Sequence, residues 1–113
     1  MTAYAETSRE KVWGSELWIV NNDKYCCKYL YLNKGAVSSY HRHLQKTETF
    51  LCTKGNVSLT IEGKKYNLDP LAEPITIEPN EYHKFEGLEN SVILEVSTHH
   101  DDSDVERLEE SKP

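Results

Sequence analysis

Three histidines and one glutamate are the residues of this chain best suited to bind a metal ion. His41 and His43 are two positions apart on an expected strand, so their side chains project from the same face. Glu48 begins the next expected strand, and an antiparallel neighbour places its first residues opposite the last residues of the strand before it. His83 follows a turn at Pro79-Asn80 and would have to arrive from a third strand.

Imidazole nitrogens together with one carboxylate suit a divalent transition ion such as Fe, Mn, Zn, Co or Ni. We therefore predict one such ion bound by His41, His43, Glu48 and His83. Four protein ligands of an octahedral set leave about two positions for water or substrate, which a catalytic metal needs. Two histidines at this spacing are more often structural when nothing else accompanies them, so the prediction depends on all four residues.

The segments that must position these residues are short, rich in Val, Ile, Leu and Tyr, and separated by turn residues. This pattern is typical of an all-β sandwich or barrel. No segment before Val105 has a helical period, and Val105–Glu110 could form one helical turn or lie disordered. The expected strands are Leu17–Val20, Tyr25–Leu32, Val37–His43, Glu48–Lys54, Val57–Ile61, Lys65–Leu68, Ile75–Ile77, His83–Glu86 and Val92–Ser97.

The whole chain, 1–113, is expected to form a single domain, with a barrel over about 11–98 and an acidic C-terminal tail over 99–113. About nine short strands in one small domain predict a closed barrel or a two-sheet jelly roll. Residues 25–32 are partly apolar on both faces, which favours a sheet covered by the core on one side and by a second subunit on the other. A homodimer is therefore expected.

Composition excludes several classes of partner. The net charge is −6 and the acidic residues gather over 101–110, so with no basic patch nucleic acid is not an expected partner. The chain has no apolar run of about 18 residues, and its polar start, Met1–Glu10, lacks the apolar region of a signal peptide. Cys26, Cys27 and Cys52 lack disulfide or metal spacing and are expected to be reduced thiols. We expect a cytoplasmic protein.

The spacing around the first two histidines resembles the first sequence motif of the cupin family. Five residues follow Gly35 before His41-Arg42-His43, four more precede Glu48, and six precede Gly55. The segment Pro79–His83 is similar to the second cupin motif, with glutamate at position 81 where the family usually has glycine. The resemblance covers roughly residues 11–97 and implies the cupin double-stranded β-helix, a jelly-roll barrel.

Two further stretches are similar to sugar-isomerase cupins. Glu10–Trp18 resembles the opening of the cupin domain in bacterial type II phosphomannose isomerases, with Val12 where that family usually has proline. Glu95–Thr98, followed by His100 and Asp104–Leu108, is similar to the closing segment of sugar-isomerase-like cupins. The resemblance implies an aldose–ketose isomerase acting on a sugar or sugar phosphate, like a mannose-6-phosphate isomerase.

Such an isomerase needs a general base near C1 or C2 of the sugar that is not already a metal ligand. Glu95 lies within an apolar strand and is the preferred candidate, while Lys46 and Tyr82 are the other candidates for catalysis. Arg42 and Lys84 are the candidates for binding the substrate. The alternative for Glu95 is a carboxylate at the rim that faces water, and the alternative for the cationic residues is a solvated surface charge.

Two other functions are compatible with the same residues. One is an iron-dependent dioxygenase that uses the three histidines and the glutamate, and the other is a non-catalytic sugar-binding cupin module that works with a partner enzyme. The stretch His99-His100-Asp101-Asp102 could form a second metal site, although a solvated tail is the simpler interpretation. Trp13 and Trp18 are assigned to the core.

Overall fold

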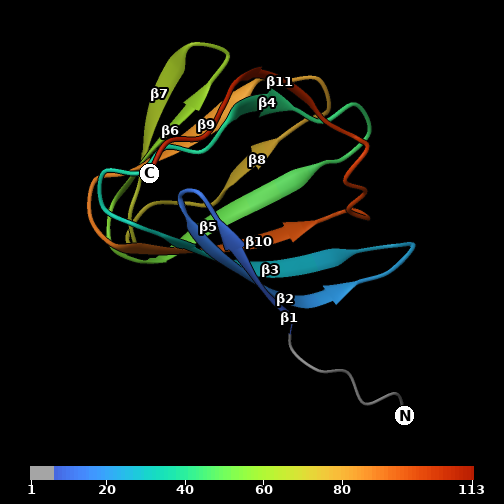
Figure 1. Cartoon of the computed structure of the whole chain (residues 1–113), viewed down its shortest axis with the longest axis horizontal. Helices are drawn as coiled ribbons and strands as arrows, with labels where there is room; N and C mark the ends of the chain where they lie inside the picture. Colours follow the sequence, from blue (N-terminus) through green and yellow to red (C-terminus); the bar gives the residue numbers. More distant parts are fainter. Residues whose placement is uncertain (1–6) are drawn as a thin grey trace.

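The computed structural model describes residues 7–113, which form eleven strands in two antiparallel sheets that face each other (Figure 1). The prediction of an all-β fold is confirmed. The larger sheet runs in the order β1 (Thr7–Lys11), β2 (Gly14–Asn21), β3 (Cys26–Leu32), β10 (Ser91–Ser97), β5 (Glu48–Lys54) and β8 (Ile75–Ile77). The smaller sheet runs in the order β11 (Glu106–Glu109), β4 (Tyr40–Arg42), β9 (His83–Gly87), β6 (Val57–Ile61) and β7 (Lys64–Leu68).

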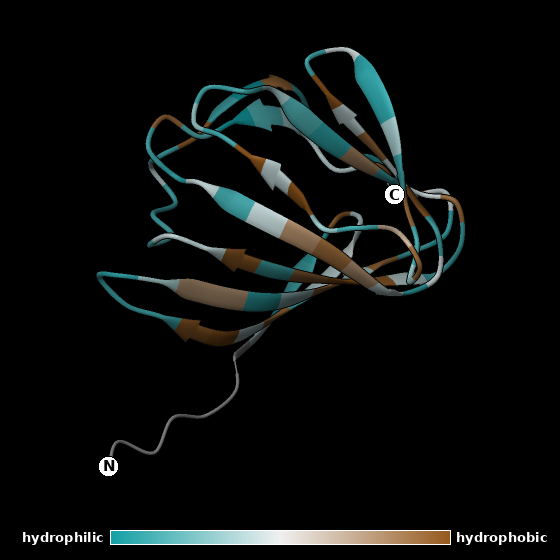
Figure 2. Cartoon of the chain, turned by 180° about the vertical axis from the view of Figure 1, so that it is seen from behind, coloured by the Kyte–Doolittle hydropathy of each residue, from teal (hydrophilic) through white to brown (hydrophobic). Residues whose placement is uncertain are grey.

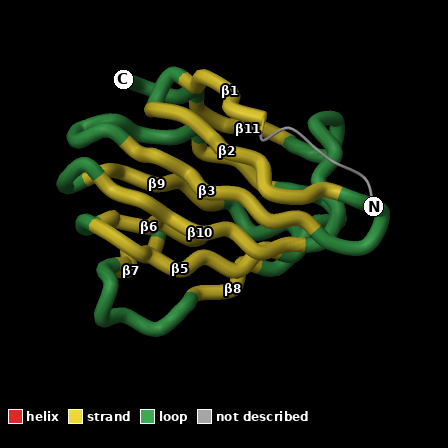
Figure 3. Tube along the Cα trace, turned by 90° about the horizontal axis from the view of Figure 1, so that it is seen from below, coloured by secondary structure: helices red, strands yellow, loops and turns green. Residues whose placement is uncertain are grey.

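Alternation along the strands determines which side chains point between the sheets. In β3 and in β10 every second residue is buried, so each strand has one inner and one outer face. Figure 2 shows hydrophobic and hydrophilic residues interspersed along the strands. The strands β2, β3, β10, β5 and β8 lie side by side in the larger sheet, as Figure 3 shows from below.

The hydrophobic core fills the space between the two sheets. Phe50 and Phe85 pack edge to face with ring centroids 4.8 Å apart, and each ring centroid lies within 6.4 Å of that of His83. The core therefore supports one of the predicted metal ligands directly. Each large core side chain contributes about 1.5–3 kcal/mol through burial. The core consists of Leu30, Leu32, Ala36, Phe50, Cys52, Val57, Leu59, Ile61, Leu68, Ile77, Phe85 and Ile93.

The two ends of the described chain form strands that the sequence pattern did not predict. β1 pairs with β2, and β11 pairs with β4. The expectation of a helical turn or disorder over Val105–Glu110 is therefore wrong. Arg107 lies opposite His41 in the β4–β11 pair, and Lys112 bridges to Val37. The edge of β4 supplies hydrogen-bond partners for this polar segment, and such a long-range contact has no signature in local periodicity.

Cys26 and Cys52 are buried free thiols, whereas the free thiol of Cys27 is partly exposed. A helix long and apolar enough to cross a membrane is not found in the part of the chain that the structure describes. The expectation about a signal peptide concerns Met1–Glu10, of which residues 1–6 lie outside the described residues.

Two glycines of the cupin-like spacing give a matched pair for a stability test. Gly35 and Gly55 both have positive φ angles, 84° and 92°. A Cβ at Gly55 would lie 2.6 Å from Asn90 O and 2.8 Å from Ser91 Cα, whereas a Cβ at Gly35 would meet no atom within 4 Å. We expect Gly55→Ala to lower the free energy of unfolding by about 3 kcal/mol or more and Gly35→Ala by about 1 kcal/mol. Denaturation in urea measures both, and equal losses would contradict the importance of the close approach at Gly55.

Candidate metal centre

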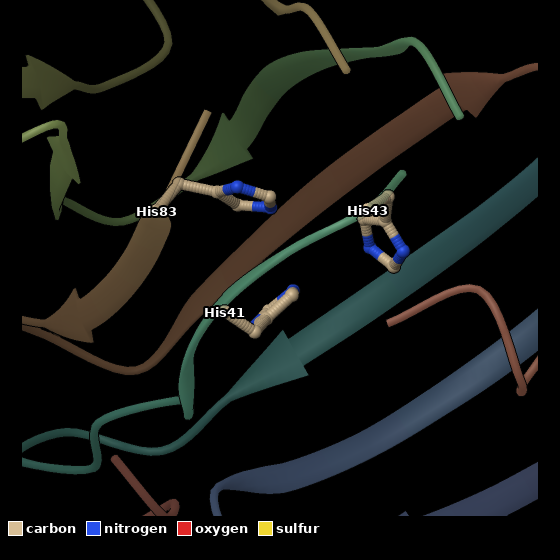
Figure 4. Close-up of side chains that lie close together, drawn as sticks. All are labelled: His41, His43 and His83. Carbon is tan, nitrogen blue, oxygen red and sulfur yellow. The ribbon is translucent and has the colours of Figure 1, made fainter. Parts of the chain in front are cut away.

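Strands β4 and β9 bring the predicted histidines together. His41 lies opposite His83 in the β4–β9 pair, and their ring centroids are 4.5 Å apart. His43 follows β4 directly, and its ring centroid lies 5.1 Å from that of His41. One potential ligand atom from each of the three residues lies within 4.8 Å of the other two. Figure 4 shows the three rings turned toward a common space.

Each of the three imidazole rings is held by a backbone carbonyl at its Nδ1 atom. A carbonyl oxygen only accepts, so each Nδ1 carries the proton and donates it. The lone pair of each Nε2 is then free to bind a cation, and the contact at Nδ1 fixes the orientation of the ring. The contacts are His41 to Ser39 O at 2.9 Å, His43 to Asp104 O at 2.8 Å and His83 to Glu81 O at 2.9 Å.

Glu48 reaches the histidines from the opposite sheet. Its Oε1 lies 2.9 Å from His43 Nε2, and its Oε2 lies 3.1 Å from His83 Nε2. The residue is only 2% exposed. Its strand is paired on both sides, so that Glu48 lies opposite Ser97 of β10 and Ile77 of β8. The structure thus brings all four predicted metal ligands to one place, with the carboxylate in contact with two of the three rings.

Two buried atoms at this place, Glu48 Oε2 and His83 Nε2, have no hydrogen-bond partner among the described residues. They are 3.1 Å apart but lack the alignment of a hydrogen bond. An unpaired buried polar atom costs about 1–3 kcal/mol, so such atoms need an explanation in a folded protein. A divalent cation among the rings and the carboxylate would pair with both atoms, and this donor set suits a transition ion.

The electrostatics favour the protonation states that a metal ligand requires at His41 and Glu48. At His83, by contrast, burial would lower the pKa, but the contact with Glu48 outweighs burial and raises it. Burial, with the nearby rings of His83 and His43, lowers the pKa of His41 to about 3, so this ring is neutral at physiological pH. Burial alone would raise the pKa of Glu48. Contacts with His43 and His83 and the charge of Lys46 outweigh burial and hold that pKa well below its usual range. A neutral imidazole and an ionised carboxylate are ready to bind a cation without first losing a proton.

Lys46 connects the metal centre with Glu95. Its Nζ lies 3.1 Å from Glu48 Oε1 and 2.8 Å from Glu95 Oε2, and it donates to His100 Nδ1 at 2.8 Å. Burial alone would lower the pKa of Lys46, but Glu95 and Glu48 together raise it above its usual value. Lys46 is therefore a buried ammonium ion that holds two carboxylates in fixed positions.

Glu95 and the metal centre face the same cavity, which has a volume of about 150 Å³. Glu95 is only 4% exposed and also accepts a hydrogen bond from Ser97 Oγ at 3.1 Å. The alternative of a rim carboxylate facing water is therefore wrong. Two of the residues proposed for catalysis, Glu95 and Lys46, lie beside the metal centre.

Tyr82, Arg42 and Lys84 do not line this cavity. Arg42 pairs with Glu106 at 2.9 Å, and its guanidinium lies 4.9 Å from the centre of the Tyr82 ring. Lys84 Nζ lies 5.3 Å from the centre of another tyrosine ring. Successive residues of a strand point to opposite faces, so the neighbours of inward-facing histidines point outward. The structure does not bring these three candidates to the site.

The C-terminal segment packs against the site instead of forming a solvated tail. The Asp104 carboxylate accepts hydrogen bonds from three successive backbone N–H groups of the loop after β4, at residues 44, 45 and 46. His100 contacts Lys46 through Nδ1 and Asp102 through Nε2, the latter at 2.7 Å. Among the described residues, the only group with three potential ligands in mutual reach is the three-histidine group, so a second metal site at 99–102 is not supported.

Sequence reasoning missed Lys28 and the contact of Trp18 with the site. Lys28 lines the cavity, is 1% exposed, and has its Nζ 4.0 Å from the centre of the Trp18 ring. Burial lowers the pKa of Lys28, although the nearby Glu95 opposes this effect. Strand alternation could have indicated that Lys28 is buried, because Lys28 lies on the same face of the strand as Leu30 and Leu32.

No protein-family model matches the chain, but curated proteins do. The D-lyxose/D-mannose isomerase of Thermosediminibacter oceani is 36% identical over 111 residues, covering 74% of this chain and 61% of the relative. The D-lyxose ketol-isomerase of Thermofilum sp. is 32% identical over 115 residues, covering 76% and 63%. This chain is a small cupin-like domain related to the D-lyxose/D-mannose isomerases. It spans less than two thirds of the length of either relative.

A shorter match agrees with the predicted likeness to type II phosphomannose isomerases. Mannose-1-phosphate guanylyltransferase of Sinorhizobium fredii is 31% identical to the cupin-like domain over 52 residues, 46% of this chain and 10% of the relative. Both the cupin resemblance and its relation to sugar isomerases are thus confirmed.

Solved structures share the fold of the cupin-like domain. CapF of Staphylococcus aureus has a TM-score of 0.79 at 18% identity, covering 95% of this chain and 35% of that protein. Streptomyces PAC13 with uridine has a TM-score of 0.79 at 15% identity, covering 96% and 93%. KdgF of Halomonas sp. has a TM-score of 0.72 at 18% identity, covering 79% and 81%. At these identities the likeness shows the fold alone.

Removal of one histidine tests the metal centre. We expect His83→Ala to weaken the binding of Mn, Fe, Co, Ni or Zn by about 100-fold or more, because losing residues that merely support metal ligands already costs about 10–100-fold. His99→Ala is the matched control, since His99 is exposed and contacts Asn22 O at 2.7 Å, outside the site. Calorimetry and elemental analysis measure the affinity and the bound ion. Unchanged affinity in His83→Ala would contradict the site.

Proposed function

We propose that the cupin-like domain is a metal-dependent aldose–ketose isomerase. The observation that carries the proposal is the placement of Glu95, held by Lys46 at 2.8 Å, beside the three-histidine group in one cavity. The relation to sugar isomerases supports the same reaction. D-lyxose and D-mannose, which share their configuration at C2, C3 and C4, are the proposed substrates, with their phosphates as the alternative.

The reaction defines what the side chains must do. Conversion of an aldose to its ketose moves a hydrogen from C2 to C1 and a proton from O2 to O1, and the total of atoms and electrons is unchanged. Glu95 takes the C2 proton as general base, which leaves an enediolate; the O2 proton passes to O1, and Glu95 returns its proton to C1. A metal held by His41, His43, His83 and Glu48 would polarise the C1 and C2 oxygens together.

Lys46 has a different role in this scheme. Two carboxylates raise its pKa, so it remains protonated and cannot act as the general base. Its ammonium orients Glu95 and Glu48, and it can also donate a hydrogen bond to a sugar oxygen. Of the two catalytic candidates in the cavity, Glu95 is the base and Lys46 is the cation that holds it.

We also propose that the protein is a cytoplasmic homodimer. The outer face of the larger sheet carries apolar side chains in register, with Leu94 opposite Tyr29 and Val96 opposite Cys27. Val96 is 50% exposed and Tyr31, on the same face, is 39% exposed. A two-fold contact between two such faces would remove this surface from water. The three free cysteines are compatible with a reducing compartment.

Light scattering tests the dimer. We expect twice the mass of the chain at micromolar concentration, because burial of the outer face stabilises association. A monomer under these conditions would count against the dimer and leave the barrel untouched.

Substitution of the base tests the isomerase. Metal-replete protein is assayed without oxygen on D-lyxose, D-mannose and their phosphates. We expect Glu95→Gln to retain the metal and to lower kcat by about 10²-fold or more, as for a lost general base. Glu86→Gln is the matched control, since Glu86 is exposed on β9.

Other outcomes would contradict the proposal in different ways. Full kcat in Glu95→Gln would show that the base lies elsewhere. If no aldose is isomerised while sugars raise the melting temperature, the sugar-binding module replaces the isomerase. Turnover that requires iron and dioxygen would indicate the oxygenase.

A further inference from the structure

A row of inward-facing side chains crosses the larger sheet, starting next to the metal centre. Phe50, Glu95, Lys28 and Trp18 lie opposite one another on β5, β10, β3 and β2. Neighbouring strands are about 4.8 Å apart, so Lys28 lies about 10 Å across the sheet from the strand that carries Glu48. Phe50, Glu95 and Lys28 of this row line the cavity and form a wall that leads away from the metal ligands.

Lys28 is the unusual member of this row. It is 1% exposed and lines the cavity, yet its Nζ forms no ion pair within 4.0 Å and no hydrogen bond with any described residue. Its Nζ lies over the Trp18 ring, 4.0 Å from the ring centre. A cation over an aromatic ring gains about 0.5–2 kcal/mol, while burial of an ion costs several kcal/mol. A ligand that accepts hydrogen bonds from this ammonium would offset the part of the burial cost that the contact with the Trp18 ring does not recover.

The groups around Lys28 decide which ligand is suitable. Glu95 faces it from the neighbouring strand, and the Glu16 carboxylate accepts a hydrogen bond from Trp18 Nε1 at 2.9 Å. Both glutamates line the cavity.

The other cations that line the cavity are Lys46, which is paired with two glutamates, and Lys11 and Arg107, which are exposed. A phosphate dianion beside Lys28 would therefore meet two carboxylates and one buried ammonium, which is unfavourable. A hydroxyl group can accept from the ammonium and donate to a carboxylate, so it matches both.

We propose that Lys28 determines substrate specificity: its ammonium binds a hydroxyl oxygen at the end of the sugar away from the metal, and the cavity takes free sugars in preference to sugar phosphates. The identity of the ligand as a sugar rests on the proposed function. Lys28 is separated from the metal ligands by Glu95, and this order along the sheet leaves the reacting carbons beside the base.

Binding of unreactive polyols tests this role independently of turnover. D-mannitol and D-arabinitol lack a carbonyl group and cannot be isomerised. We expect manganese-loaded protein to bind them, and Lys28→Met to weaken this binding about tenfold or more, as for the loss of a charged hydrogen-bond donor in a buried site. Lys28→Gln, which keeps a hydrogen-bond donor, should lose less affinity for the polyols than Lys28→Met. D-mannitol 1-phosphate should bind more weakly than D-mannitol to the unaltered protein.

The control is Lys64→Met, since Lys64 Nζ also lies near an aromatic ring, 5.9 Å from the centre of Tyr66, but is exposed. It should bind D-mannitol normally, and all variants should keep their metal content and remain folded. Calorimetry measures the affinities.

Three results would overturn the proposal. The first is a folded Lys28→Met variant that binds D-mannitol as tightly as the unaltered protein does. The second is an unaltered protein that binds neither polyol. The third is an unaltered protein that binds D-mannitol 1-phosphate more tightly than D-mannitol and loses this phosphate binding in Lys28→Met. If Lys28→Met loses mannitol binding but the unaltered protein isomerises no aldose, the isomerase proposal fails and the Lys28 subsite stands.

Discussion

Lys46 lies buried between two carboxylates, and the geometry of the site depends on these contacts. Its ammonium is 3.1 Å from Glu48 and 2.8 Å from Glu95. An ion moved from water into a protein interior loses several kcal/mol of solvation, which is recovered only when charges are paired with good geometry. Without Lys46, two carboxylates would be buried in one cavity with mutual repulsion. The same ammonium therefore holds the carboxylate of the metal centre and the carboxylate proposed as the base, so that neither can move independently of the other.

The two sheets supply different parts of this arrangement. The smaller sheet carries the histidines, where pairing of β4 with β9 sets His41 opposite His83. The larger sheet carries both carboxylates, Glu48 on β5 and Glu95 on β10, and β10 is hydrogen-bonded on both sides. A residue on a central strand cannot shift along it without breaking both ladders. The site is thus precise because it is built on paired strands, whereas the loop after β4, which carries Lys46, is held by the Asp104 carboxylate.

Local spacing explains how much of the site could be predicted from the sequence. His41, His43 and Glu48 are close in sequence, so strand alternation and one antiparallel turn suffice to bring them together. The same alternation, applied strictly, would have excluded Arg42 and Lys84, which neighbour inward-facing histidines. Other contacts have no local signal. Trp18 meets Lys28 only through strand pairing, next to a register shift in β2, and His100 reaches Lys46 across 54 residues of sequence. The strand β11 likewise forms because the edge of β4 is available, which a short charged segment cannot reveal by itself.

Three places where this barrel departs from the usual rules of burial face one cavity. Glu48 Oε2 and His83 Nε2 lack hydrogen-bond partners among the described residues, and Lys28 buries an ammonium ion against an aromatic ring. Each departure lowers stability, and natural proteins tolerate such costs mainly where function requires them. These groups differ in the ligand that they can bind. Glu48 Oε2 and His83 Nε2 have lone pairs for a cation, whereas the Lys28 ammonium donates hydrogen bonds to an oxygen. A ligand that satisfies both ends must carry its polar groups along its length, and the base Glu95 lies between those ends. An open-chain polyol has this property, because it bears an oxygen on every carbon.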